Sequence, residues 1–367
     1  RCGRSGHTLV ERSPTPSPAS MELPERSSQT PMDDEADIHT LVVGREAMAC
    51  RFEVVFNAGE VADATELACD ALDLVDEVEN AFSVYRDTSD LAILNATAAA
   101  GWQPVSHEVL ALLERSRALY DLTGGGFDVA AGSLVRAWGF LARQGRTPTD
   151  EALAAARAAA GMRHVEIDSA GRRVRFTQPG VEINPGAIGK GWAVDRAVEW
   201  LADRGVPSVL VHGGSSSVRA IGGRGPGGPG RRSWPVGLRH PLRPDARLAT
   251  IALADRALGT SGSGTQFFVD RGRRLGHILD PRSGRPAEGV ISATVLAADA
   301  ATADALATAL YVLGPEGLPA VAPPESGVAA ILVLPAVAGR LAVVTANLDA
   351  GDVAWNRAEP LEITTRG

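Results

Sequence analysis

Apolar residues in this 367-residue chain recur at two different spacings, and the order in which these spacings follow one another restricts the fold. Alternating, β-branched runs predict strands, for example over Cys50–Phe56 and Ser292–Ala298. Helical spacing predicts helices over Val61–Phe82 and Ala301–Leu313. Because strands and helices do not alternate in a regular βαβ rhythm, the sequence predicts an α+β fold rather than a doubly wound parallel sheet.

Two segments beside predicted helices are interpreted as loops. The stretch SVYRDTSDLAILNA at 83–96 follows the first predicted helix, and Asn184–Gly191 contains one proline and three glycines. Glycine and proline interrupt regular structure. We therefore expect the helix that follows the second loop to run from about Trp192 to Arg204.

Composition divides the chain into a tail and one domain. Residues 1–38 are rich in Ser, Pro and charge and have no long apolar run, so we expect a disordered tail without a secretory signal. Residues 39–367 are expected to form a single domain, with the glycine-rich segment 222–232 as an insertion. No segment has 18 consecutive apolar residues, so no membrane span is expected.

Charge and cysteine content exclude several classes of protein. The formal net charge is −8, which leaves no basic excess to neutralise nucleic-acid phosphates. The three cysteines, Cys2, Cys50 and Cys69, form neither a metal-binding pattern nor an even-numbered framework. We therefore expect free thiols and a reducing, cytoplasmic location.

Lys190 is the only lysine, whereas arginine supplies the other 35 basic side chains. One reading is chance, because an exposed lysine at the start of a helix needs no role. The other is a site that requires a compact point charge rather than a planar fork. Its flanking residues, Gly189 and Gly191, do not form a Walker A loop, because Asn184 stands where the first glycine should be. A glycine-rich helix start still suits an anionic ligand.

Three other patterns carry candidate chemistry. Asp304 and Thr308 are four residues apart on a predicted helix, so their oxygens share one face and suit a hard cation such as Mg²⁺; the simpler reading is a solvated polar stripe. His277 precedes Asp280 and a turn, which alone indicates structure more often than catalysis. The segment around Ser261 resembles an esterase elbow, but the elbow requires glycine where Ser263 stands.

Taken together, the motifs resemble the ApbE family, which are flavin transferases that attach FMN from FAD to threonine or serine hydroxyls of target proteins. The resemblance spans roughly residues 41–357. It rests on the order of the following segments: FSVYRDTSDLAILN, GGGFDVAAGSLVRAWGF, INPGAIGKGWAVDRA, VLVHGGSSSVRAIG, LGTSGSG, GHILDPRSGRP and ADALATAL.

The resemblance implies one α+β domain around an FAD cleft, with FAD as substrate, Mg²⁺ as cofactor and an acceptor flavoprotein with a Ser/Thr flavinylation motif as partner. Asp304, Thr308 and a backbone carbonyl near Gly186–Ala187 match the metal ligands. His277, Lys190 and Asp195 match catalytic positions, and whether Lys190 contacts phosphate or pairs with Asp195 stays open. The positions expected to contact FAD are Tyr85, Ser89, Asn95, Lys190, Gly213, Gly214, Ser261, Gly262 and His277.

The sequence departs from the common family pattern at the first strand and at one turn. Met48-Ala49-Cys50 replaces Met-Gly-Thr, and Gly213-Gly214-Ser215 replaces Gly-Gly-Asp, so the contact of that carboxylate is in doubt. Many relatives are exported lipoproteins. Rival readings are an FAD pyrophosphatase that releases free FMN, an FAD-binding protein without chemistry, and an esterase.

Overall fold

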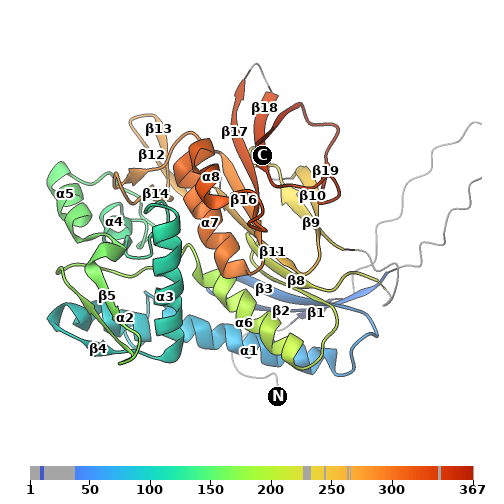
Figure 1. Cartoon of the computed structure of the whole chain (residues 1–367), viewed down its shortest axis with the longest axis horizontal. Helices are drawn as coiled ribbons and strands as arrows, with labels where there is room; N and C mark the ends of the chain where they lie inside the picture. Colours follow the sequence, from blue (N-terminus) through green and yellow to red (C-terminus); the bar gives the residue numbers. More distant parts are fainter. Residues whose placement is uncertain are drawn as a thin grey trace, which may run out of the picture.

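A ten-stranded β-sheet runs through the structure (Figure 1). The computed structural model describes residues 9–11, 38–225, 233–243, 245–262, 264, 266–337 and 340–366. The sheet order is β1-β2-β3-β7-β8-β11-β16-β17-β18-β20, and every neighbouring pair is antiparallel except β18 and β20. The strands are β1 Leu9–Glu11, β2 Thr40–Ala47, β3 Cys50–Asn57, β7 Val209–Gly213, β8 Ser217–Ile221, β11 Arg256–Gly262, β16 Ser292–Ala297, β17 Ala329–Val337, β18 Arg340–Ala346 and β20 Leu361–Arg366.

Three helices cover one face of this sheet (Figure 1). They are α1 Ala64–Phe82, α6 Gly189–Asp203 and α7 Ala300–Leu313. A three-stranded sheet covers the other face and shares a second apolar core with it. This sheet consists of β9 Trp234–Arg239, β10 Arg247–Leu253 and β19 Val353–Trp355. Because both faces are covered, every residue of β16 is buried.

Most of the remaining elements lie to the left of the sheet in Figure 1. They bring a third apolar cluster that includes Trp138, Phe140 and Leu279. The helices are α2 Asp90–Thr97, α3 His107–Leu122, α4 Gly132–Ala137 and α5 Asp150–Ala159, with the 3₁₀ turns η1 Ala98–Ala100 and η2 Met162–His164. The strands are β4 Gln103–Pro104, β5 Val165–Asp168, β6 Arg173–Phe176, β12 Phe267–Asp270, β13 Arg273–Gly276, β14 Leu279–Asp280 and β15 Arg285–Pro286; η3 Gly314–Gly317 and α8 Leu318–Val321 follow α7.

Helix α7 contacts its neighbours at backbone distance. A Cβ atom on Gly259 of β11 would lie 2.4 Å from the carbonyl carbon of Ala303, and one on Gly191 of α6 would lie 2.2 Å from the carbonyl oxygen of Ala300. Alanine-rich α7 is buried along most of its length and has no wide polar face. Small residues on both sides of each contact therefore let α7 lie directly against α6 and β11.

The predicted α+β class is confirmed, and most predicted elements are found within a few residues of their expected ends. Two predicted loops extend too far. Residues 83–96 contain α2, whose first turn is capped by the Ser89 hydroxyl accepting from the Ala92 N–H at 3.0 Å. Helix α6 begins at Gly189, not at Trp192, because the close contact of Gly191 with α7 stabilises a helical start that glycine by itself disfavours.

The cysteine prediction is also wrong in part. Cys50 is free, as predicted, whereas Cys69 is disulfide-bonded; the cytoplasmic location stays a prediction. Within the predicted tail, β1 pairs with β2, and the rest of residues 1–37 lies outside the described residues. The same holds for residues 226–232 of the predicted insertion. Among the described residues, no helix is both long and apolar enough to cross a membrane.

We expect Gly259→Ala to lower the free energy of unfolding by about 2 kcal/mol, because the new methyl group must displace the backbone of α7. Gly351→Ala is the matched control: nothing lies within 4 Å of a Cβ atom there, and φ is not positive, so the change should stay within about 0.5 kcal/mol. Denaturant unfolding of both variants measures the difference. Equal stability of the two variants would contradict the close contact.

Candidate functional site

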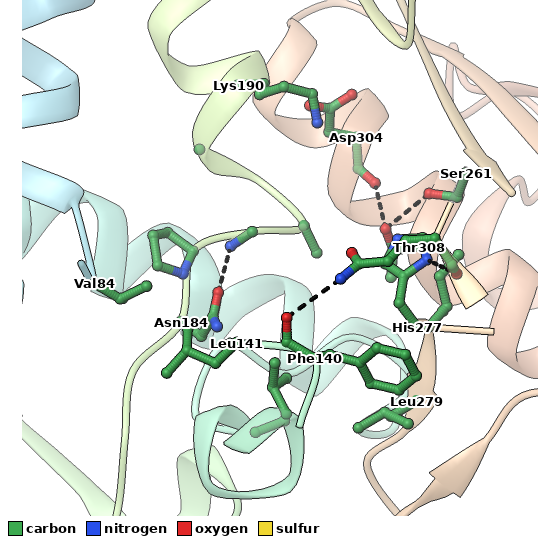
Figure 2. A pocket seen from close by; sticks show the side chains of 18 of the residues that line it. Val84, Phe140, Leu141, Asn184, Lys190, Ser261, His277, Leu279, Asp304 and Thr308 are labelled. Carbon is green, nitrogen blue, oxygen red and sulfur yellow. Dashed lines mark hydrogen bonds between the residues drawn. The ribbon is translucent and has the colours of Figure 1, made fainter. Parts of the chain in front are cut away.

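A cavity of about 750 Å³ opens beside α7 and the first turn of α6 (Figure 2). This volume is typical of small-molecule sites. Its walls come from parts of the chain that are far apart in sequence. The lining residues lie within 48–49, 79–85, 126–143, 184–190, 260–266 and 277–281 and on α7, with residue 216 between β7 and β8.

One part of the wall is apolar and aromatic. Phe140, Leu141 and Val84 line the cavity (Figure 2), and Tyr85 lies beside them with 68% of its surface exposed. Exposed tyrosine at the edge of an apolar wall can stack on a planar ring. The predicted place of Tyr85 at the flavin end of the site is therefore compatible with the structure.

Asp304 lies on the polar side of the cavity. Its carboxylate accepts hydrogen bonds from the Gly191 N–H at 2.9 Å and from the Ser217 hydroxyl at 2.6 and 2.9 Å. Burial raises the pKa of this carboxyl to about 6, although the charge of Lys190 and both hydrogen bonds favour the ionised form. Asp304 is thus a buried acid at a place where an additional positive charge would stabilise its carboxylate.

Thr308 lies one turn after Asp304 on α7 and also lines the cavity. Its hydroxyl donates to the Asp304 backbone carbonyl at 3.1 Å and lies 2.9 Å from the Ser261 hydroxyl (Figure 2). The solvated-stripe reading is wrong for Asp304, which is buried. Among the described residues, the Ser261 hydroxyl is hydrogen-bonded to a threonine hydroxyl and to no histidine, so the nucleophilic pair of an esterase is not assembled there.

Lys190 extends toward Asp304 in Figure 2 from the first turn of α6. In the described part of the chain it makes no hydrogen bond or ion pair, yet its charge lowers the pKa values of Asp304 and His277. The positive end of the α6 dipole points the same way. Gly191 is required for the α7 contact, whereas a Cβ on Gly189 would meet only ordinary contacts. Lys190 therefore presents a cation without a hydrogen-bonded or ionic partner to the cavity, which Arg143 also lines.

His277 lies where β13 leads into β14 and lines the cavity. Its Nδ1 lies 3.1 Å from the Gln266 carbonyl oxygen, which can only accept, so we assign the proton of the neutral ring to Nδ1. Burial lowers the pKa of His277, the Gln266 carbonyl opposes this shift, and the charge of Lys190 adds to it. Near neutral pH the ring is therefore unprotonated at Nε2 and can accept a proton there.

Asp195 does not line the cavity. Its carboxylate accepts from the N–H groups of Ala300 and Ala301, both at 2.8 Å, and from Arg219 at 2.8 Å. The structure therefore places Asp195 against the start of α7 rather than in the cavity, where Lys190 does not pair with it, and its catalytic role stays a prediction. The position of the Asp195 side chain is set by its buried hydrogen-bonding partners, and spacing along the sequence cannot reveal these partners.

Four residues expected to contact FAD lie outside the cavity lining. Gly213 and Gly214 shape the turn before β8: a Cβ on Gly213 would meet the Phe52 ring at 2.7 Å, and Gly214 has a φ of 60°. Ser89 caps α2 and donates to the Ser83 carbonyl at 2.5 Å. The Asn95 amide bonds both backbone groups of Ile183, at 2.7 and 3.0 Å, beside a smaller cavity of about 240 Å³.

These four residues thus support the wall from behind. The other predicted positions do line the cavity: Tyr85, Ala187, Lys190, Ser261, Gly262, His277, Asp304 and Thr308. Sequence reasoning missed Ser217 and Gln266. Ser217 follows a serine-rich turn and Gln266 has no motif around it, so only their hydrogen bonds to Asp304 and His277 reveal them.

Comparisons with known proteins find the same architecture. A profile of the ApbE family matches residues 48–332. A protein of Vibrio cholerae named FAD:protein FMN transferase is 35% identical over 260 residues, covering 70% of this chain and 76% of that protein. One of the same name from Treponema pallidum is 33% identical over 313 residues, covering 80% and 83%.

Solved structures agree in fold. The apo crystal structure of the Pseudomonas stutzeri flavinyl transferase ApbE superposes with a TM-score of 0.72 at 29% identity, covering 85% of this chain and 96% of that chain. The ApbE protein of Thermotoga maritima gives a TM-score of 0.71 at 30% identity, covering 80% and 94%. The resemblance drawn from the motifs is confirmed: this chain belongs to the ApbE family.

Proposed function

We propose that this chain transfers FMN from FAD to a hydroxyl group of an acceptor protein and releases AMP. The observation that carries the proposal is one cavity with an aromatic wall and a polar end that holds Lys190, Asp304, Thr308 and His277. Family relatives named FAD:protein FMN transferase support it. FAD fits a cavity with an aromatic wall and a polar end, because it has a planar apolar ring at one end and a charged pyrophosphate near its middle.

The polar end suits a pyrophosphate. Lys190 and the first turn of α6 supply positive potential to the cavity. The Ser261 hydroxyl and the backbone of Gly262 also line the cavity. Tyr85 and the apolar wall around Phe140 would receive the isoalloxazine ring.

Magnesium fits the acidic side of the cavity. Among the described residues, no cluster of three or more His, Cys, Asp or Glu side chains could hold a metal ion. Magnesium, however, binds proteins through one or two carboxylates and takes further oxygens from phosphates and water. Asp304, the Thr308 hydroxyl and the backbone carbonyl of Ala187 would supply the protein ligands. When bound, the ion would neutralise charge on the pyrophosphate and on the departing AMP.

His277 would accept the proton of the reaction. The acceptor hydroxyl oxygen forms a bond to the FMN-side phosphorus of FAD, and the bond from that phosphorus to the AMP oxygen breaks. The hydroxyl proton passes to Nε2 of His277, which is free because Nδ1 donates to the Gln266 carbonyl. Lys190 stabilises negative charge on the phosphates, and positioning supplies most of the remaining rate acceleration.

The test is incubation of the protein with FAD, Mg²⁺ and lysate proteins of its source as acceptors, followed by in-gel flavin fluorescence and measurement of AMP. Flavin that stays on a protein band under denaturing conditions, together with AMP, supports transfer. Equal amounts of free FMN and AMP without a labelled band would instead show an FAD pyrophosphatase. FAD binding without AMP would show a binding protein.

Asp304→Asn removes one ligand charge and nearly preserves shape. We expect the affinity for Mg²⁺ to fall and FMN transfer to slow by about 10²-fold, because hard cations favour charged oxygens. Binding of FAD should change little, since most of its contacts lie away from α7. The measurements are the transfer rate against Mg²⁺ concentration and the dissociation constant of FAD.

Asp299→Asn is the matched control, because it removes the same charge at the start of the same helix and outside the cavity. It should behave as the unchanged protein. A shared Mg²⁺ dependence of Asp304→Asn and the control would remove Asp304 from the metal site.

Lys190→Arg keeps the charge and changes its shape. We expect turnover to fall about tenfold, or roughly 1.4 kcal/mol, because a planar fork does not reproduce a point charge beside Asp304. Arg196→Lys on the same helix is the control, since Arg196 lies outside the cavity and pairs with Glu108. If Lys190→Arg keeps both turnover and FAD affinity, the shape of the cation has no role.

The pH profile of the reaction should report His277. Because its pKa is lowered, the ring stays neutral below pH 6.5, so the rate at saturating Mg²⁺ should be flat from pH 8 to 6.5 and fall only at lower pH. His277→Gln should lower the rate about 10²-fold and remove this acidic limb. An unchanged acidic limb in the variant would assign the proton transfer to another group.

A further inference from the structure

Two layers of polar contacts join α7 to α6 and β8. The first, which we name the pocket layer, consists of Gly191, Ser217 and Asp304. The second, the anchor layer, consists of Asp195 and Arg219 and the N–H groups at the start of α7, on Ala300 and Ala301. Both layers use the same three elements.

The two layers are separated by about one helical turn on α6 and α7 and by two residues on β8. Gly191 and Asp195 are four residues apart on α6, as are the N–H of Ala300 and the side chain of Asp304 on α7. Four residues of helix advance by about one turn, or ~6 Å. Ser217 and Arg219, two residues apart on β8, face the same side of the strand and advance by ~6.6 Å. A shift of α7 along its axis therefore disturbs both layers together.

In the anchor layer Asp195 is buried, Arg219 is half-buried, and both are paired. Asp195 is 8% exposed, and its Oδ1 accepts from the Ala300 N–H and from Arg219 Nη1, while its Oδ2 accepts from the Ala301 N–H. Arg219 also lies 3.1 Å from Glu199 of α6. The first N–H groups of a helix have no partner within the helix and favour a negative charge.

Ordinary helix capping does not account for Asp195. Helix α7 already has its own cap, because Asp299 accepts from the Thr302 N–H at 2.8 Å. Asp195 belongs to a different helix, so its bonds tie α7 to α6 rather than closing α7 on itself. At the contact of Gly191 with Ala300 the two helix backbones meet, so residue 191 has no side chain there that could set the register.

We infer that the pair of Asp195 and Arg219 positions α7 against α6 and β8, and thereby sets the place of the Asp304 carboxylate in the cavity. Asp195 acts through α7 and does not touch the reacting atoms. The inference rests on the proposed function for its catalytic consequence, because it assigns the metal affinity of Asp304 to a pair behind it. Its structural part concerns this chain alone.

The test compares Asp195→Ala with Asp299→Ala, since each removes a carboxylate from the start of α7 and only the first breaks the link to α6. We expect both to lower the melting temperature. In Asp195→Ala, the affinity for Mg²⁺ measured by calorimetry with FAD bound, and the turnover, should each fall about tenfold or more, whereas the KM for FAD stays within about twofold. Asp299→Ala should keep all three values.

Asp195→Asn keeps one accepting oxygen and should restore part of the metal affinity, and Arg219→Met should reproduce the loss without altering α6 or α7. These two variants decide the question if Asp195→Ala does not fold. Equal metal affinity and turnover in the Asp195, Arg219 and Asp299 variants would overturn the inference.

A measurement without metal or FAD separates this inference from the proposed function. The Gly191 N–H donates to Asp304 across the two helices, so its hydrogen exchange, followed by NMR, reports their register. Exchange should be about tenfold faster in Asp195→Asn than in Asp299→Ala. Equal exchange would refute the positioning role, whereas an unchanged protein that neither binds FAD nor releases AMP would refute the proposed function alone.

Discussion

The close approach of α7 to α6 and β11 is the constraint on which the rest of the structure depends. It requires glycine at two places, Gly191 and Gly259, where any side chain would meet the α7 backbone. It also requires small residues along α7 itself, which is rich in alanine. Because of this contact, Asp304 reaches from α7 to the Gly191 N–H on α6 and to Ser217 on β8. A bulkier interface would leave that carboxylate without its two donors.

The electrostatics of the cavity follow from this packing. Asp304 is buried, and Lys190 has no partner among the described residues, so an acid with a raised pKa and an uncompensated cation face the same space. Such an arrangement costs folding free energy unless a ligand completes it. Under the proposed function, a pyrophosphate with a divalent cation would supply the missing charges of both signs. Arg219, in contrast, is paired with Asp195 behind the cavity.

The polar and the apolar ends of the cavity are supported in different ways. At the apolar end, Ser89 and Asn95 hold the loops beside Tyr85 and Asn184 from behind, through bonds to backbone groups. At the polar end, the turn at Gly213 and Gly214 positions the serines that follow it, of which Ser217 reaches Asp304. These residues belong to family motifs and shape the wall from outside the cavity lining, and their predicted contacts with FAD stay predictions.

The sequence by itself determined the α+β class, most helices and strands, and the residues of the polar end, because periodicity and motif order are local properties. His277, Lys190, Asp304 and Thr308 were all predicted, and all line one cavity. Tertiary structure decided the start of α6, the position of Asp195 and the part played by Ser217. Each depends on a contact between residues more than 80 positions apart, such as the Asp195 carboxylate with the N–H groups of α7. Local spacing carries no information about such a partner, because the same aspartate on the same helix face could serve a ligand, a metal or a neighbouring helix, and only packing chooses among them.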